Sequence, residues 1–389
     1  MAFLSSVVQG IIDNKWVVLF YAAIIFFIIV RRKRFEFQAK IIALYRTNFG
    51  IGMINRIGTR HSELIKLIGY CGIGVGFIGM GLILFMMGKG LWDLLFIPEA
   101  PPVISPVLPG VQIPGSPVFV PFVYGIISLF IVVLIHEFSH GIVAKAHGIT
   151  VKSTGFFFAG PIIGAFVEPD DKQMLKKGDV VNYSVAAAGP FSNVITAGIV
   201  IAIMAAVLTP LTNHLAAPQG VVFTNVEDGF PAQKAGIEEG VLYDFANNQS
   251  VSDVSEFEAA LKGLEVGDYV MVGNSQNKYL IQTTSRPESP DKAVIGVNVR
   301  TKYANEDEWW LKSLLWLDQL FFWIFVLSIG LGLANLLPLG PIDGGVMIRQ
   351  ALQKVKGEKA GLRAWMKLTV FMLVILLILV FIPIIKAVI

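Results

Sequence analysis

Long apolar segments constrain the fold of this chain more than any other feature. Six runs approach the ~20 residues that a helix needs to cross the hydrocarbon core of a bilayer. Every backbone polar group in that core must be hydrogen-bonded within the protein, so such segments form helices. The runs are Trp16–Val30, Leu67–Met87, Val118–Ile142, Tyr183–Leu208, Leu314–Leu337 and Leu368–Val388. We therefore expect a polytopic α-helical membrane protein with about six transmembrane helices.

The composition agrees with a membrane protein and excludes other classes. Of the 389 residues, 54% are hydrophobic and 15% are charged, whereas soluble domains average roughly a quarter charged residues. The net charge is only +3 and the basic residues cluster in loops, so the partner is a lipid bilayer and no nucleic acid is expected. The single cysteine, Cys71, excludes both an internal disulfide and a cysteine-based zinc site.

Lysine and arginine residues predict the orientation of the spans. The loops at residues 31–66 and 346–367 are strongly basic, and basic loops stay in the cytoplasm. Alternation then places both termini and the segment between the fourth and fifth spans outside the cytoplasm. We therefore expect a multi-pass protein of the cell membrane.

Residues 218–300 differ from the rest of the chain. Alternating apolar positions occur at residues 221–223 and 269–272, and Asp228-Gly229 and Glu239-Gly240 are typical turn pairs. A short helical pattern covers Val254 to Leu261. This segment is predicted to be a small α+β domain, inserted between the fourth and fifth spans on the extracytoplasmic side.

The sequence His136-Glu137-Phe138-Ser139-His140 lies at the end of the third apolar run. Two imidazoles four residues apart share one face of a helix, so both can bind one Zn²⁺ ion while the intervening Glu137 acts as a general base. Ionisable side chains at membrane depth are costly and usually mark function. The motif predicts zinc-dependent hydrolysis within the membrane, toward its cytoplasmic side.

Catalytic zinc requires a third protein ligand. Asp343 is the best candidate because it follows the fifth span on the cytoplasmic side, at the depth expected for the motif. Pro338 and Pro341 break the helix there and allow a carboxylate to turn into the bundle. An ordinary Asp-Gly turn at a helix exit is the alternative. The other histidines are less well placed: His61, His147 and His214.

Residues 155–166, GFFFAGPIIGAF, are apolar but do not suit a helix. Gly155, Gly160, Pro161 and Gly164 interrupt any helical pattern. Irregular backbone at membrane depth persists only where it is buried in protein or lines a watery cavity. We therefore expect a membrane re-entrant hairpin beside the zinc site, with an ordinary interfacial loop as the alternative.

Three motifs together resemble those of a known family. HEFSH, then AAAGPFSN at 186–193, then NLLPLGPIDGG at 335–345 resemble, in order, the core motifs of the site-2 protease family of intramembrane zinc metalloproteases. The resemblance implies that His136, His140 and Asp343 bind one Zn²⁺ ion and that Glu137 is the catalytic base. It also implies that Asn335 holds the scissile carbonyl or its oxyanion. The substrates would be transmembrane proteins, cut after a first cleavage of their ectodomains.

The inserted segment has a resemblance of its own. PAQKAGIEEG at 231–240 and the residues after it resemble a PDZ domain of the bacterial protease type, and Ile295-Gly296-Val297 is similar to a carboxylate-binding loop. Such domains bind extended peptides by adding a strand to a sheet edge. The implied partner is a peptide or a substrate ectodomain, and the alternative is a steric lid that binds no peptide.

The predicted organisation has five segments. They are transmembrane helices 1–2 with the basic cytoplasmic loop (1–110), the N-terminal section of the catalytic membrane core (111–217), the PDZ-like domain (218–300), the C-terminal section of that core (301–345) and the cytoplasmic loop with the last helix (346–389). Two other functions stay open. One is a different membrane zincin with a Glu ligand, for which we find no downstream ExxxE/D motif. The other is a non-proteolytic, PDZ-containing membrane scaffold or regulatory homologue.

Overall fold

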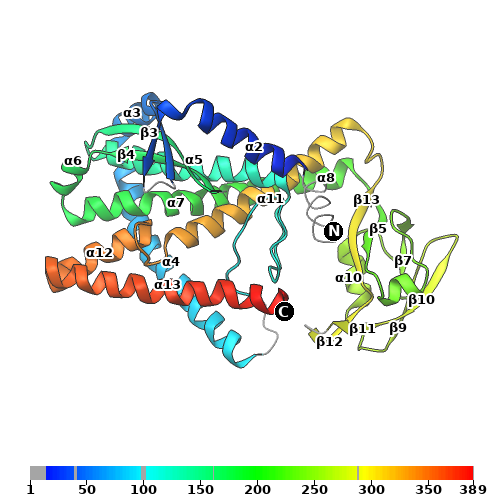
Figure 1. Cartoon of the computed structure of the whole chain (residues 1–389). Coiled ribbons are helices and arrows are strands. Elements are labelled where there is room, and N and C mark those ends of the chain that lie inside the picture. Colours follow the sequence, from blue (N-terminus) through cyan, green and yellow to red (C-terminus); the bar gives the residue numbers. More distant parts are fainter. Residues whose placement is uncertain (1–14, 39–41, 98–101, 161, 287–288, 389) are drawn as a thin grey trace. The chain divides into compact units, whose positions relative to one another are not determined.

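The computed structural model describes residues 15–38, 42–97, 102–160, 162–286 and 289–388. The chain divides into two compact units (Figure 1). The first, called the helical unit below, comprises Met1–Ala202 and Leu320–Ile389. The second, called the β-rich unit, comprises Ile203–Gln319 and contains the segment predicted to be an inserted domain.

Within the described residues, five helices are long and apolar enough to cross a membrane. They are α4 (Ser62–Phe96), α5 (Phe122–Ala146), the continuous run of α7 (Asp179–Ile203), π-helical η2 (Met204–Leu208) and α8 (Thr209–Leu215), then α11 (Trp309–Asn335) and α13 (Glu358–Val388). The first predicted span corresponds to α2 (Lys15–Val30), which has only 16 residues. The residues before Lys15 lie outside the described part of the chain, so the number of spans stays a prediction.

Small residues on α4 allow close helix packing in the helical unit. A Cβ on Gly69 would collide with Ser184 of α7, and one on Gly76 would press against Met347 of α12 (Asp343–Lys356). Membrane helices commonly associate through such small residues, because lipid provides no hydrophobic driving force between them. The packing of α4 thus fixes α7 and α12, both of which contribute to the site described below.

The apolar, glycine-containing segment predicted to be a hairpin contains two paired strands, while its entry into the membrane stays a prediction. Strands β3 (Val151–Ala159) and β4 (Ile162–Pro169) pair antiparallel, with Ala159 opposite Ile162 next to the turn. They belong to a four-stranded sheet in the order β1-β2-β3-β4, so β4 is an end strand. The hairpin also packs against α5, the helix that carries the HExxH motif.

The basic segment at residues 31–66, predicted to connect the first two spans, contains secondary structure. The segment contains η1 (Arg32–Arg34), β1 (Phe35–Gln38), β2 (Ile42–Thr47) and the amphipathic helix α3 (Ile51–Arg60). β2 pairs with β3 over its whole length, and the Phe35 ring lies 5.9 Å from that of Phe158 and 5.2 Å from that of Tyr45. Aromatic contacts across strands stabilise the sheet, and the surrounding lysines and arginines obscured this pattern in the sequence.

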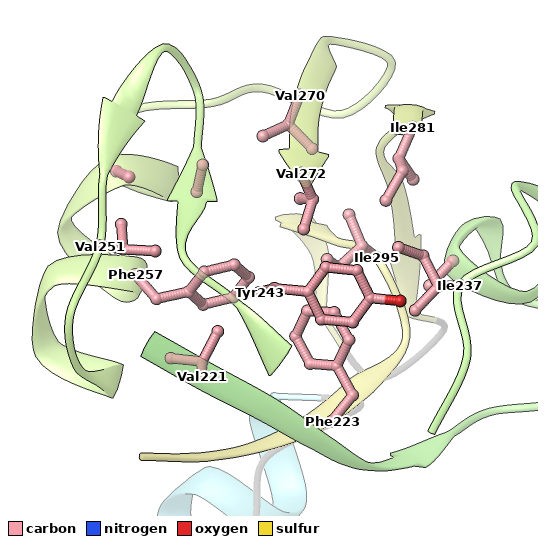
Figure 2. Packing of buried hydrophobic residues seen from close by; sticks show 13 residues of the cluster. Val221, Phe223, Ile237, Tyr243, Val251, Phe257, Val270, Val272, Ile281 and Ile295 are labelled. Atoms are coloured by element: carbon pink, nitrogen blue, oxygen red, sulfur yellow. The ribbon is translucent and has the colours of Figure 1, made fainter. Parts of the chain in front are cut away.

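The β-rich unit is built from short strands around an apolar core. One sheet has the order β13-β5-β6 and a second the order β10-β9-β7-β8. The elements are β5 (Pro218–Val226), α9 (Pro231–Lys234), β6 (Leu242–Tyr243), β7 (Phe245–Ala246), β8 (Gln249–Ser250), α10 (Val254–Leu261), β9 (Tyr269–Gly273), β10 (Lys278–Gln282), β11 (Thr284–Arg286), β12 (Ser289–Val294) and β13 (Val297–Tyr303). Phe223 and Tyr243 stack at 4.8 Å in the core and are fully buried (Figure 2).

Candidate metal centre

The two histidines of the HExxH motif lie on one face of α5. Their ring centroids are 5.0 Å apart, as expected for residues separated by about one helical turn. His136 is 3% exposed. One possible ligand atom from each of His136, Glu137 and His140 lies within 4.8 Å of the others. This region of the chain therefore forms a group that can hold a metal ion.

Asp343 lies directly against both imidazoles, although it is 207 residues from His136 in the sequence. Its Oδ2 atom is 3.1 Å from Nε2 of His136, and its Oδ1 atom is 3.4 Å from Nε2 of His140. The carboxylate thus faces the same nitrogen of each ring.

The glycines after Asp343 explain how α12 delivers the carboxylate. A Cβ on Gly344 would collide with the carbonyl of Leu336, and one on Gly345 with the carbonyl of Gly340. The first turn of α12 therefore packs against the preceding backbone at a distance that only glycine allows. The indole N–H of Trp365 on α13 donates to the Gly345 carbonyl at 2.9 Å and holds this turn.

A second hydrogen bond orients each imidazole. Nδ1 of His140 donates to the Val185 carbonyl at 2.7 Å, which leaves its Nε2 lone pair free for a metal. Nδ1 of His136 lies 3.1 Å from the amide nitrogen of Asn193, whose buried Oδ1 has no partner among the described residues. If the Asn193 side-chain amide is rotated by half a turn, its Oδ1 accepts a hydrogen bond from Nδ1–H of His136, and the buried oxygen gains a partner. Nε2 of His136 is then free to bind a metal.

Gly189 on α7 keeps the space between the ligands open. A Cβ at this position would come within 2.5 Å of Nε2 of His136 and even closer to Nε2 of His140. The chemistry of the donors also suits zinc, which binds imidazole nitrogen and carboxylate oxygen. The residues present therefore fit a zinc ion. The sequence placed Gly189 and Asn193 in a motif without indicating these roles.

Glu137 points from α5 toward the hairpin. Its Oε2 atom accepts a hydrogen bond of 3.2 Å from the main-chain N–H of Val167 on β4. Asn335 is the last residue of α11, and its Nδ2 atom is 3.4 Å from Nε2 of His136. The structure thus brings together all the side chains that the sequence singled out, while their roles as ligands, base and oxyanion donor stay predictions.

Among the described residues, the group of possible metal ligands around His136 includes no other histidine than His140. His147 follows the last residue of α5, where its Nε2 atom is 3.4 Å from Oγ of Ser184. It is seven residues beyond His140, about 10 Å along the helix axis. His61 precedes α4 and is exposed, and His214 lies on α8 in the β-rich unit. None of these three therefore competes with Asp343 as the third donor within the described residues.

These observations define a class of protein: a polytopic helical membrane protein in which an HExxH helix and a distant aspartate form a buried candidate metal centre. The sequence model of Peptidase family M50 matches residues 124–379. The chain therefore belongs to peptidase family M50, the site-2 protease family of zinc-dependent membrane metalloproteases.

One relative extends the similarity beyond the motifs. An uncharacterized protein of Methanocaldococcus jannaschii is 28% identical over 339 residues, which cover 84% of this chain and 83% of that protein. The similarity therefore includes most of both chains.

Proposed function

We propose that this protein is an intramembrane zinc endopeptidase that hydrolyses peptide bonds within transmembrane segments of other membrane proteins. The observation that carries this proposal is the convergence of His136, His140 and Asp343 on the space that Gly189 keeps open. The helices that supply these residues include spans long and apolar enough to cross a membrane. A buried charged centre on such helices is costly unless it has a function.

The side chains divide the chemistry between them. When bound by His136, His140 and Asp343, zinc would polarise the scissile carbonyl and lower the pKa of water. Glu137 removes a proton from the attacking water and passes it to the leaving amine. The amide N–H of Asn335 donates to the oxyanion that develops on the carbonyl oxygen.

A transmembrane substrate must unwind before it can be cut, because helical peptide groups are shielded by their own hydrogen bonds. In the bilayer the freed groups need new partners. The end strand β4 lies beside Glu137, and adding the unwound segment to its edge would supply those partners. This arrangement supports a role for the hairpin in holding the substrate.

The charge distribution supports an orientation for the site. The basic segments at 31–66 and 346–367 favour the cytoplasm, which puts the metal centre toward that side and residues 218–300 outside. Water would then reach His136 from the cytoplasm, and substrates would present their ectodomains to the β-rich unit.

Zinc content and cleavage distinguish this function from a membrane scaffold. The purified protein should contain about one zinc ion per chain and should cut a single-span substrate in lipid vesicles. A zinc chelator should stop the reaction, and restored zinc should restart it. A protein that lacks zinc and leaves the substrate intact would instead support the scaffold.

We also propose that the β-rich unit binds extended segments of substrates. β13 is the end strand of its sheet, and Thr301 on β13 accepts a hydrogen bond of 3.2 Å from the N–H of Val254, where α10 begins. Gly296 precedes the strand at φ +81° and its Cα faces the Phe230 ring. A strand edge beside a helix suits peptide binding by strand addition.

Removing residues 219–302 tests whether this segment excludes bulky ectodomains. Tyr303 is the strand partner of Pro218, so a short Gly-Ser linker joins the cut ends without stretching the flanking helices. Substrates with long ectodomains should then be cut as fast as trimmed ones, as measured by fragment release in vesicles. If the shortened protein still cuts only trimmed substrates, residues 219–302 do not exclude bulky ectodomains. Cleavage of the trimmed substrate is the control for activity.

A further inference from the structure

The hydrogen bond from Val167 to Glu137 shows which main-chain groups of β4 face away from β3. The β3–β4 pairing runs without a shift from Ala159 opposite Ile162 to Thr154 opposite Val167. Residues of an antiparallel strand then alternate between bonding the partner strand and facing away from it. Because the Val167 N–H donates to Glu137, this alternation makes the main-chain groups of Ile163, Ala165 and Val167 face away from β3, at the outer edge of β4.

Glu137 contacts β4 through this outward-facing N–H. The Val167 N–H is not needed by the ladder, and it donates to Oε2 of Glu137 at 3.2 Å. The Val167 side chain packs with Ile54 and Phe138, and a Cβ on Gly141 would come within 2.8 Å of it. The Val167 side chain is therefore packed against both α3 and α5.

We propose that the main-chain N–H of Val167 is the group that positions the catalytic base. It binds one carboxylate oxygen of Glu137 and leaves the other free to take the proton from water. A hydrogen bond to a charged acceptor is stronger than one between neutral groups, so it selects one side-chain conformation of Glu137. The inference rests on the proposed protease function and adds a component that the HExxH motif does not contain.

The same bond sets the register of the substrate. Because the Val167 N–H is hydrogen-bonded to Glu137, a substrate strand added to β4 would form its hydrogen bonds with the outward-facing main-chain groups of Ala165 and Ile163. The substrate therefore pairs at these two residues, and the scissile bond lies beyond Ala165 on the side of Glu137. Binding and catalysis thus use different amides of one strand edge.

Two proline variants separate these roles. Proline lacks the N–H and is tolerated on an edge strand where that N–H faces outward. Val167→Pro should lower kcat between about 10- and 100-fold, the range typical for losing a partner of a metal-site residue, with KM unchanged. Ala165→Pro should raise KM and leave kcat unchanged. Val167→Ala keeps the amide but loses the same side-chain packing, so it is the reference against which the kcat of Val167→Pro is compared.

Zinc content completes the test, because His136, His140 and Asp343 do not depend on this amide. Val167→Pro should bind as much zinc as the wild type. Loss of zinc would overturn the proposal, since the amide would then support the metal centre and not the base. A kcat equal to that of Val167→Ala would overturn it too, and an unchanged KM in Ala165→Pro would overturn the substrate register. If the wild type cuts no substrate, the proposed function fails, and that failure is separate from these outcomes.

Discussion

Replacing Glu137 with glutamine should abolish cleavage of a transmembrane substrate and leave the zinc content unchanged. Glutamine has the same shape and retains a carbonyl oxygen that can accept from the Val167 N–H. It cannot take a proton from water, so the rate should fall at least about 100-fold, the lower end of the effect of general acid–base catalysis. Fragment release and metal analysis on one preparation measure both quantities.

Glu168→Gln is the matched control for this prediction. Glu168 is the next residue of the same strand and interacts with Ser153 and Arg46. Successive side chains of a strand point to opposite faces, so its carboxylate faces away from the α5-packed side of β4. We expect it to cleave like the wild type. Full activity in Glu137→Gln would remove Glu137 from the reaction.

Replacing Asp343 with alanine should greatly weaken zinc binding. Its two carboxylate oxygens lie 3.1 and 3.4 Å from Nε2 of His136 and His140. Without it only the two histidines remain of the three proposed ligands, and three protein ligands are usual for catalytic zinc. The loss of affinity should exceed the roughly 100-fold found when an outer-shell partner is removed. Competition with a chromophoric zinc chelator measures it.

Asp179→Ala controls for the loss of an aspartate from the first turn of a helix. Asp179 begins α7 as Asp343 begins α12, and its carboxylate pairs with Lys354 at 2.9 Å. This variant should bind zinc like the wild type. If Asp343→Ala also keeps its zinc, Asp343 is not a ligand and a different third donor must be sought.

Patterns local in sequence predicted much of the fold. The apolar runs gave the long helices, and the HExxH spacing placed His136 and His140 on one face of α5. The break in helical pattern at 155–166 indicated the hairpin. Each of these features depends on residues close together in the chain, where helical or strand periodicity is sufficient.

Features that depend on tertiary contacts were harder to predict. Strand β2 is stabilised by pairing with β3, and Phe35 on β1 contacts Phe158 on β3. Neither interaction can be seen within residues 35–47 alone. Gly189 and Asn193 act through the shape and hydrogen bonds of the centre, so their roles needed the packed helices. The role proposed for the Val167 amide cannot be recognised in the sequence, because every residue except proline has a main-chain N–H.

The position of the cut tests the central claim most directly. A single-span substrate in vesicles would be incubated with the wild type and with Glu137→Gln, and the new termini would be mapped by mass spectrometry. An intramembrane protease should produce termini within the apolar segment of the substrate, and these should be absent with the variant. Termini confined to the loops outside that segment, or equal in both reactions, would contradict intramembrane proteolysis by this centre.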